Sequence, residues 1–276
     1  MPGLADSPLR ECWNKLRRAE EHAQALDTEI AQFLDSQPYS VVREFDANQC
    51  KYLFRLKVLK TIPQERLACI IGDCIHNARS ALDYIAWRLA GSDLDDRQTL
   101  WPVFLEPAGF EKRGLPRLTR MHPDAVAEIR RLQPYNRGYG EPSALWTLHD
   151  LDARDKHKLL TMTQTVAKNA EINILHPINS RPYPIRFSQG TFEDDVILAE
   201  VDIPAGVVNP KVEVRSNYIF DISFQQGIIT LNGEYAVRPA LGQILETVKR
   251  ILLRFENLIA ANPSWISNRS ACRGKS

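Results

Sequence analysis

Residues 239–259, PALGQILETVKRILLRFENLI, decide the fold class of this chain. Apolar residues recur in this stretch every three or four positions, which is the spacing of one face of an α-helix. They form one broad stripe, made of Leu241, Ile244, Leu245, Val248, Ile251, Leu252, Phe255, Leu258 and Ile259. A stripe of this width is buried only by other helices, so the sequence predicts a helical bundle to which residues 239–262 belong.

Helical spacing recurs along the first half of the chain. The predicted helices span residues 8–35, about 64–90, 123–133 and 142–165. Ser7-Pro8 is a helix-start signal, and Gly91 is placed to end the second helix. The proline-punctuated stretch 92–120 is expected to be loop.

Two regions alternate apolar and polar residues instead. Residues 41–45 and 52–58 flank the turn sequence Asp46-Ala47-Asn48-Gln49, which predicts a β-hairpin with one wet face. Between the last two predicted helices, short β-branched runs are separated by Pro, Gly and Asn, which predicts an antiparallel sheet or small sandwich. These runs cover residues 171–175, 183–187, 196–203, 212–214, 219–224 and 227–231.

The predicted fold is therefore α+β, a helical bundle with a β-hairpin and a β-rich module before the last helix. The bundle with its hairpin (40–58) is expected over 1–165, and the β module over 166–238. The helix at 239–262 is expected to return to the bundle. Residues 263–276 are expected to form a flexible tail.

Composition limits the classes of function. The chain has 276 residues, 44% of them hydrophobic, and 35 Lys and Arg against 34 Asp and Glu, for a formal net charge of +1. The predicted β module, with six basic and nine acidic residues, carries −3. No global field therefore attracts nucleic acid or an anionic membrane, and any such site must be local.

Sequence signals also bear on location and cofactors. The N-terminus lacks the pattern of a secretory signal, and no stretch approaches the ~18 apolar residues of a membrane span. The five cysteines form no Cys-x-x-Cys pair and are expected to be reduced thiols in the cytoplasm. Phosphate-binding glycine loops and common hydrolase motifs are missing, so no cofactor is expected.

Two helical segments carry charges at the border of their apolar faces. Arg79 stands four residues after Ile75 and three before Leu82. Asp152 and Asp155 occupy positions of the 142–165 helix that its spacing assigns to the core. An unpaired buried charge costs several kcal/mol, so we expect Asp155, or Asp152, to pair with Arg79.

Three interpretations of this polar cluster are open. In the first, the ion pair only fixes helix register. In the second, the cluster is a site that combines an acid–base group, an anion clamp and an orienting carboxylate, formed by His76, Arg79, Asp83, Tyr84, Asp155, Lys156 and His157. In the third, His76, His149 and His157 bind a metal with Asp152, although His149 and His157 face about 80° apart on one helix. Trp101 is expected to plug the core beneath a loop or to stack on a ligand.

Residues 72–83 (GDCIHNARSALD) and 148–157 (LHDLDARDKH) also carry a resemblance. They resemble a widespread family of bacterial proteins of unassigned function, which is recognised by GDxxHNxRSALD and LxxLxxxDKH segments. The resemblance covers about residues 40–165 and takes in Trp-Pro-Val-Phe at 101–104 and Gln-Pro-Tyr at 133–135. It is specific as a family match and implies no activity.

The same segment is more weakly similar to HEPN helical-bundle proteins, many of which are metal-independent ribonucleases in toxin–antitoxin and phage-defence systems. That resemblance implies a site at a dimer interface, with an Arg and a His separated by four to six residues. Arg79 matches the Arg, whereas Tyr84 stands where the His would be. Because tyrosine has an unperturbed pKa of about 10, proton transfer would fall to His76 or His157.

The leading expectation is a cytoplasmic, HEPN-like protein, homodimeric, that binds or cleaves RNA in stress or phage defence. Arg79 would hold the phosphate, His76 or His157 would move the 2′-hydroxyl proton, and Asp155 would orient one of them. Further binding contacts are expected from Asp83, Tyr84, Lys156 and Trp101. The alternative is a non-catalytic interaction or small-molecule-binding module, in which Arg79 and Asp155 are structural and Trp101 and Tyr135 line a pocket.

Overall fold

The α+β class is confirmed by the computed structural model, which combines long helices with antiparallel strands. The structure describes residues 7–91, 99–136, 143–158, 160–166, 171–175, 185–187, 193–203, 213–217, 220–224 and 236–267. These residues divide into two units. The helical unit is built from those within 1–27, 65–160 and 227–276, and the β unit from those within 28–64 and 161–226.

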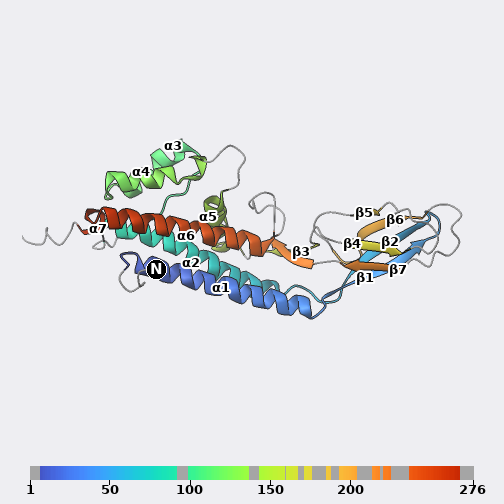
Figure 1. The fold of residues 1–276 in the computed structure, drawn as a ribbon. Helices are drawn as coiled ribbons and strands as arrows, with labels where there is room; N and C mark the ends of the chain where they lie inside the picture. Colours follow the sequence, from blue (N-terminus) through green and yellow to red (C-terminus); the bar gives the residue numbers. More distant parts are fainter. Residues whose placement is uncertain are drawn as a thin grey trace, which may run out of the picture. The chain divides into compact units, whose positions relative to one another are not determined.

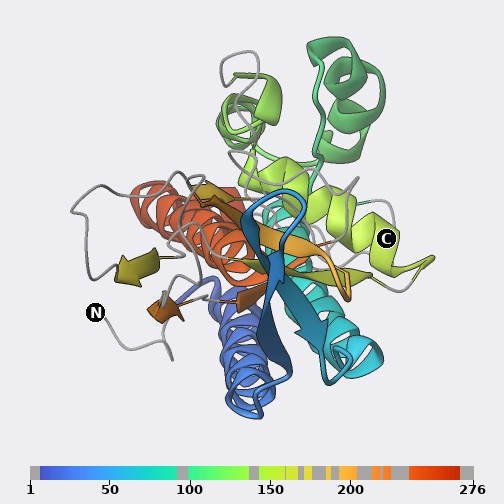
Figure 2. The same ribbon diagram turned by 90° about the vertical axis from the view of Figure 1, so that its right-hand side faces the viewer.

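Three long helices run side by side in Figures 1 and 2, and each buries one apolar stripe. They are α1 (Arg10–Asp35), α2 (Gln64–Ala90) and α6 (Val237–Ala261). The predicted C-terminal stripe is confirmed, because Leu241, Leu252 and Phe255 are all at most 1% exposed. Among the described helices, none is both long and apolar enough to cross a membrane.

The shorter helical elements of this unit are α3 (Pro107–Gly109), the π-helical turn η2 (Phe110–Gly114), the 3₁₀ turns η3 (Leu115–Leu118) and η4 (Pro134–Asn136), α4 (Pro123–Arg131), α5 (Ala144–Asp155) and α7 (Ser264–Ser267). A charged contact joins α4 to α6, since Glu128 accepts hydrogen bonds from Nε and Nη2 of Arg254. Burial opposes ionisation of Glu128, but the hydrogen bonds from Arg254 and Arg131 prevail and lower its pKa.

Within the described residues, the β unit contains three antiparallel groups of strands. A four-stranded sheet has the order β1-β2-β6-β5, while β3 pairs with β8 and β4 with β7. The strands are β1 (Tyr39–Asp46), β2 (Lys51–Val58), β3 (Met162–Val166), β4 (Glu171–Leu175), β5 (Ile185–Phe187), β6 (Ile197–Asp202), β7 (Glu213–Asn217) and β8 (Phe220–Phe224). The predicted hairpin is confirmed, with Asp46 opposite Lys51 in the observed register, and Leu56 lies in a buried cluster with Tyr39 and Leu198.

One domain assignment is wrong. The hairpin at 40–58 belongs to the β unit and not to the helical bundle, because β2 pairs antiparallel with β6 from Lys51 opposite Asp202 onward. Strands leave unpaired backbone groups at their edges, and another strand is the partner that satisfies them. The β unit is therefore assembled from two separate stretches of the chain, and the residues that pair between β2 and β6 are more than 130 positions apart.

The helix predicted at 142–165 is also shorter than expected. Within the described residues α5 ends at Asp155, and Met162 begins strand β3 opposite Phe224. The backbone N–H of Met162 donates to Oε1 of Gln64 at 2.9 Å. Pairing across the chain thus takes Met162–Val166 out of the helix, and His157 lies beyond the helix end.

The last differences lie in loop and tail. Part of the predicted loop 92–120 is helical from Pro107 to Leu118, where the ring of Phe110 packs edge-on against Phe104 and Tyr135. Within the predicted tail, α7 buries Trp265 to 7% exposure. The predicted strand at 227–231 and the end of the chain, 268–276, lie outside the described residues.

Candidate functional site

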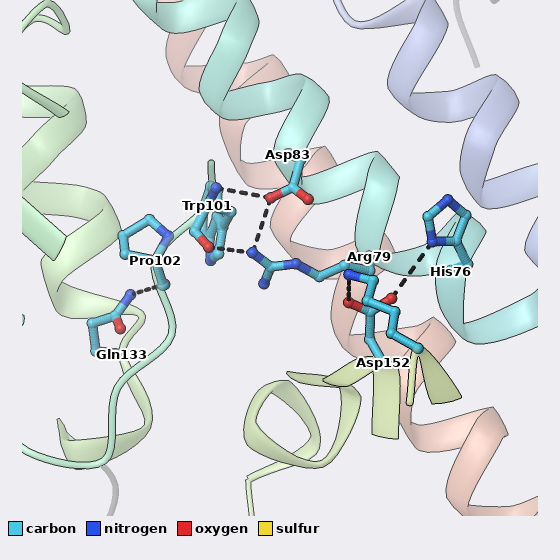
Figure 3. Close-up of polar contacts among 8 residues, drawn as sticks. His76, Arg79, Asp83, Trp101, Pro102, Gln133 and Asp152 are labelled. Atoms are coloured by element: carbon cyan, nitrogen blue, oxygen red, sulfur yellow. Dashed lines mark hydrogen bonds and ion pairs between the residues drawn. The ribbon is translucent and has the colours of Figure 1, made fainter. Parts of the chain in front are cut away.

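Arg79 is the centre of a buried hydrogen-bonded network in the helical unit (Figure 3). Its side chain is 9% exposed, and its Nη2 donates to Oδ1 of Asp83 at 2.9 Å and to the carbonyl oxygen of Trp101 at 2.5 Å. The backbone N–H of Trp101 donates to the same Asp83 oxygen at 2.9 Å. Asp83 is one turn after Arg79 on α2, so the network ties this helix to the Trp101 segment.

The Trp101 segment is held from two further sides. The indole ring of Trp101 is fully buried and packs edge-to-face on Phe255 of α6, with ring centroids 5.4 Å apart. Gln133, itself buried, donates from Nε2 to the carbonyl oxygen of Pro102 at 2.9 Å and accepts at Oε1 from the N–H of Phe104 at 3.1 Å. The core-plug interpretation of Trp101 therefore holds, and its side chain is closed to a ligand.

The prediction that Arg79 pairs with Asp155 or Asp152 is wrong. The Arg79 guanidinium pairs with Asp83 and the Trp101 carbonyl, and Figure 3 shows it pointing away from Asp152, which faces His76. An acid on the same helix, Asp83, and one main-chain carbonyl oxygen pair with Nη2 of Arg79, so its charge has a partner without Asp152 or Asp155 of α5. Burial raises the pKa of Asp83, while Arg79 and the Trp101 N–H act against that rise.

Arg79 is therefore a poor phosphate clamp. Its Nη2 is occupied, and its Nη1 is buried without a hydrogen-bond partner among the described residues. The Trp101 Nε1 is in the same condition. With the Arg79 side chain 9% exposed, a phosphate of a polynucleotide would reach the guanidinium only if the groups that bury it moved.

A second polar group lies between α2 and α5. The carboxylate of Asp152 is 7% exposed and accepts from Nζ of Lys156 at 2.6 Å. Nδ1 of His76, whose side chain is 61% exposed, lies 3.6 Å from the other Asp152 oxygen. That separation is too long for a hydrogen bond and allows an ion pair when His76 is protonated.

Asp155 and His157 are not part of the Arg79 network. Asp155 lies against Gly72 of α2, where a Cβ atom would be 2.5 Å from its Oδ2. Burial, with Asp152 and Asp73 nearby, raises the pKa of Asp155. The side chain of His157 is exposed and has no hydrogen-bond or ion-pair partner in the described part of the chain.

The third interpretation was a metal. Its residue His149 packs against the ring of Trp146 at 5.5 Å, and burial together with Arg79 lowers its pKa. Across the ranges that the structure describes, no three His, Cys, Asp or Glu side chains are grouped so as to hold a metal ion.

A cavity lies beside the network, between the first turn of α1 and the last turns of α2. We call it the α1–α2 pocket. It has a volume of about 450 Å³ and is lined by Glu11, Cys12, Asp83, Tyr84, Trp87, Arg88, Thr99 and Leu100. Asp83 therefore belongs both to the network and to the pocket wall.

The sequence patterns did not predict this pocket, although two of its residues were expected to be binding contacts of the polar cluster. Asp83 and Tyr84 were predicted as binding residues, whereas Glu11, Cys12, Trp87 and Arg88 were missed. The available signal was the pair Tyr84 and Trp87 at helical spacing on the polar side of α2, 41% and 38% exposed. Neither Trp101 nor Tyr135 lines this pocket, because Trp101 is in the core and Tyr135 packs against Phe110.

Comparisons with known proteins add no relative: no family model matches the chain, and neither curated proteins nor solved structures gave a significant match.

Proposed function

We propose that the helical unit is a small-molecule-binding module and that the α1–α2 pocket is its binding site. The observation that carries this proposal is the cavity itself. Its volume of about 450 Å³ falls in the ordinary range of ligand sites, and aromatic and apolar side chains alternate in its wall with a few charged ones.

The Arg79 network gives this site a rigid wall. Asp83 is fixed by Arg79 and by the Trp101 N–H, and the same contacts hold the chain immediately after Thr99 and Leu100. A side chain that is already ordered loses less entropy when a ligand binds. In this proposal Arg79 is a positioning residue that never touches the ligand.

The test is a fragment screen on the full chain by ligand-observed NMR, repeated on Trp87→Leu. Fragments whose NMR signals change in the presence of the parent protein should show no change in the presence of Trp87→Leu. Phe45→Leu is the matched control, because Phe45 is an exposed aromatic residue of the β unit, and it should bind as the parent does. The proposal fails if no fragment binds, or if every fragment that binds the parent binds Trp87→Leu equally well.

A second proposal keeps RNA cleavage, and the observation that favours it is the solvent-exposed His76 beside the buried Asp152. His76 would take the 2′-hydroxyl proton, the 2′-oxygen would bond to phosphorus, and the bond to the 5′-oxygen would break. Lys156, held at 2.6 Å by Asp152, would protonate the leaving oxygen. In this version of the HEPN mechanism, Arg79 makes no contact with RNA. The second proposal also keeps the expectation of a homodimer in the cytoplasm.

Cleavage of a labelled RNA by the parent, His76→Ala and His157→Ala tests this second proposal. His76→Ala should abolish cleavage with a melting temperature within a few degrees of the parent, and His22→Ala is the control. Unchanged cleavage in His76→Ala, or no cleavage by the parent at any dimer concentration, removes it. It ranks second because Asp152 lies 3.6 Å from His76 and Asp155 is also near His76, and acids repel a phosphate backbone.

A further inference from the structure

The chemistry of the α1–α2 pocket wall points to one class of ligand. Four of its residues come from two successive turns of α2: Asp83 and Tyr84 are neighbours on one turn, and Trp87 and Arg88 follow four positions later on the next. Tyr84 and Trp87 expose 41% and 38% of their surface. Two neighbouring aromatic rings that are open to solvent beside a cavity favour a flat or cationic ligand.

The two carboxylates of the wall require hydrogen-bond donors. Both hydrogen bonds of Asp83 go to its Oδ1, and its Oδ2, turned away from Arg79 in Figure 3, has no hydrogen-bond partner among the described residues. The side chain of Glu11 is 52% exposed, and its contact with Arg10 is 4.0 Å long. An ionised carboxylate is an acceptor only, so a ligand that faces these groups must bring N–H or O–H donors.

The cations near the pocket already have partners. Nε of Arg88 donates to the carbonyl oxygen of Pro8 at 3.1 Å. Lys15, outside the lining, lies 5.8 Å from the centre of the Tyr84 ring and donates to Oδ1 of Asn77 at 3.3 Å. In the wall the acids Glu11 and Asp83 accompany the base Arg88, and Asp83 is already paired with Arg79, so Glu11 is the carboxylate with the least compensated charge.

Cys12 contributes an inert surface. Burial and the nearby Glu11 carboxylate raise the pKa of its thiol to about 12, so the thiol stays protonated at neutral pH. It packs as a small apolar group and offers no nucleophile for covalent capture of a ligand.

We infer that the α1–α2 pocket binds a small aromatic amine or amidine as a cation, with its ring on Trp87 and its N–H groups toward Asp83 and Glu11. This inference rests on the proposed small-molecule function and adds the charge and shape of the ligand. A cation on an indole ring combines ring stacking with electrostatic attraction, Glu11 supplies the counter-charge, and Oδ2 of Asp83 accepts a hydrogen bond.

Benzamidine, benzamide and benzoate test the inference, because they have nearly the same shape and carry charges of +1, 0 and −1. Calorimetric titration of the full chain at low salt should give benzamidine an affinity about tenfold higher than benzamide, with benzoate weakest. Trp87→Leu should weaken benzamidine about tenfold. Glu11→Gln should weaken it by about threefold and leave benzamide unchanged, while Glu20→Gln, a charge change elsewhere on α1, should have no effect.

The outcomes separate the inference from the proposed function. If benzamide or benzoate binds as tightly as benzamidine and is lost in Trp87→Leu, the ligand class is wrong and the pocket function stands. The ligand class is likewise wrong if none of the three binds while other fragments respond to Trp87→Leu. If benzamidine binds Trp87→Leu and Glu11→Gln as tightly as it binds the parent, the inference is overturned. A fragment screen in which nothing binds overturns the pocket function as well.

Discussion

At the scale of single residues, the buried Arg79 guanidinium is stabilised by polar groups of Asp83 and of the Trp101 main chain. Its Nη2 bonds both Asp83 and the Trp101 carbonyl, and the Trp101 N–H completes the triangle. A buried charge is tolerated when it is paired and hydrogen-bonded, and removing one partner leaves the other uncompensated. The contribution of this network to stability therefore depends on all three residues together and cannot be assigned to one of them.

Arg79→Met should lower the free energy of unfolding by about 3–5 kcal/mol, because Asp83 loses its counter-charge while it remains buried. Urea denaturation measures the loss. The double variant Arg79→Met, Asp83→Asn should recover part of it, since the orphaned charge is gone. Arg18→Met, which removes an exposed pair with Glu21, should change stability by less than about 1 kcal/mol. An Arg79→Met protein as stable as the parent would refute the structural role.

His149 should make stability depend on pH in a defined direction. Burial lowers its folded-state pKa below the ordinary value of 6.5, so the unfolded chain binds the extra proton first as pH falls. Its contribution is present above about pH 6.5 and is lost as pH drops toward the folded-state pKa. The stability advantage of the parent over His149→Gln should therefore shrink between pH 7.5 and 5.5. An advantage that grows on acidification would contradict this sign.

At the scale of elements, α2 lies close to the end of α5 at Gly72. A Cβ atom there would lie 2.5 Å and 2.8 Å from the two carboxylate oxygens of Asp155, whereas one on Gly242 of α6 would meet nothing within 4 Å. Alanine favours helix over glycine by about 1 kcal/mol, so the two glycines should respond differently to the same substitution.

Gly242→Ala should raise the free energy of unfolding by up to about 1 kcal/mol, and Gly72→Ala should fail to do so because Asp155 must move. Chemical denaturation of both variants measures the difference. Adding Asp155→Ser to Gly72→Ala should restore the gain, since the obstructing carboxylate is gone. An equal gain in the two single variants would show that Gly72 has room to spare.

At the scale of the whole molecule, the chain forms two units from interleaved segments. The hairpin and the strands after Leu160 form the β unit, and α2, α5 and α6 form the helical unit around the candidate sites. Leu56 is fully buried in the β-unit cluster of Tyr39, Leu56 and Leu198. Its substitution therefore probes whether the two units open separately.

Leu56→Ala should remove about 2–5 kcal/mol from the β unit, through lost burial and the cavity that remains. Hydrogen exchange read by mass spectrometry should show faster exchange in β1, β2 and β6, with α6 and most of α2 protected as in the parent. Affinity for any ligand of the α1–α2 pocket should be unchanged. Uniformly faster exchange throughout both units would mean that they unfold as one cooperative body.

The sequence by itself determined the elements whose signals are local. Helix periodicity, Gly91 with its positive φ of 90° after α2, and the alternation that marks β2 all depend on neighbours within a few positions. The long helices and the hairpin were therefore predicted to within a few residues. The burial of Arg79 was indicated in the same way, by its place at the edge of the α2 stripe.

Only the tertiary structure decided which groups meet. The partner of Arg79 includes a main-chain carbonyl at Trp101, 22 positions away, and no side-chain pattern reveals where a carbonyl will point. The hairpin joined the β unit through pairing with β6, and the α1–α2 pocket required the first turn of α1 beside the end of α2. Such contacts follow from the global packing of distant segments, so the same local patterns were compatible with other partners.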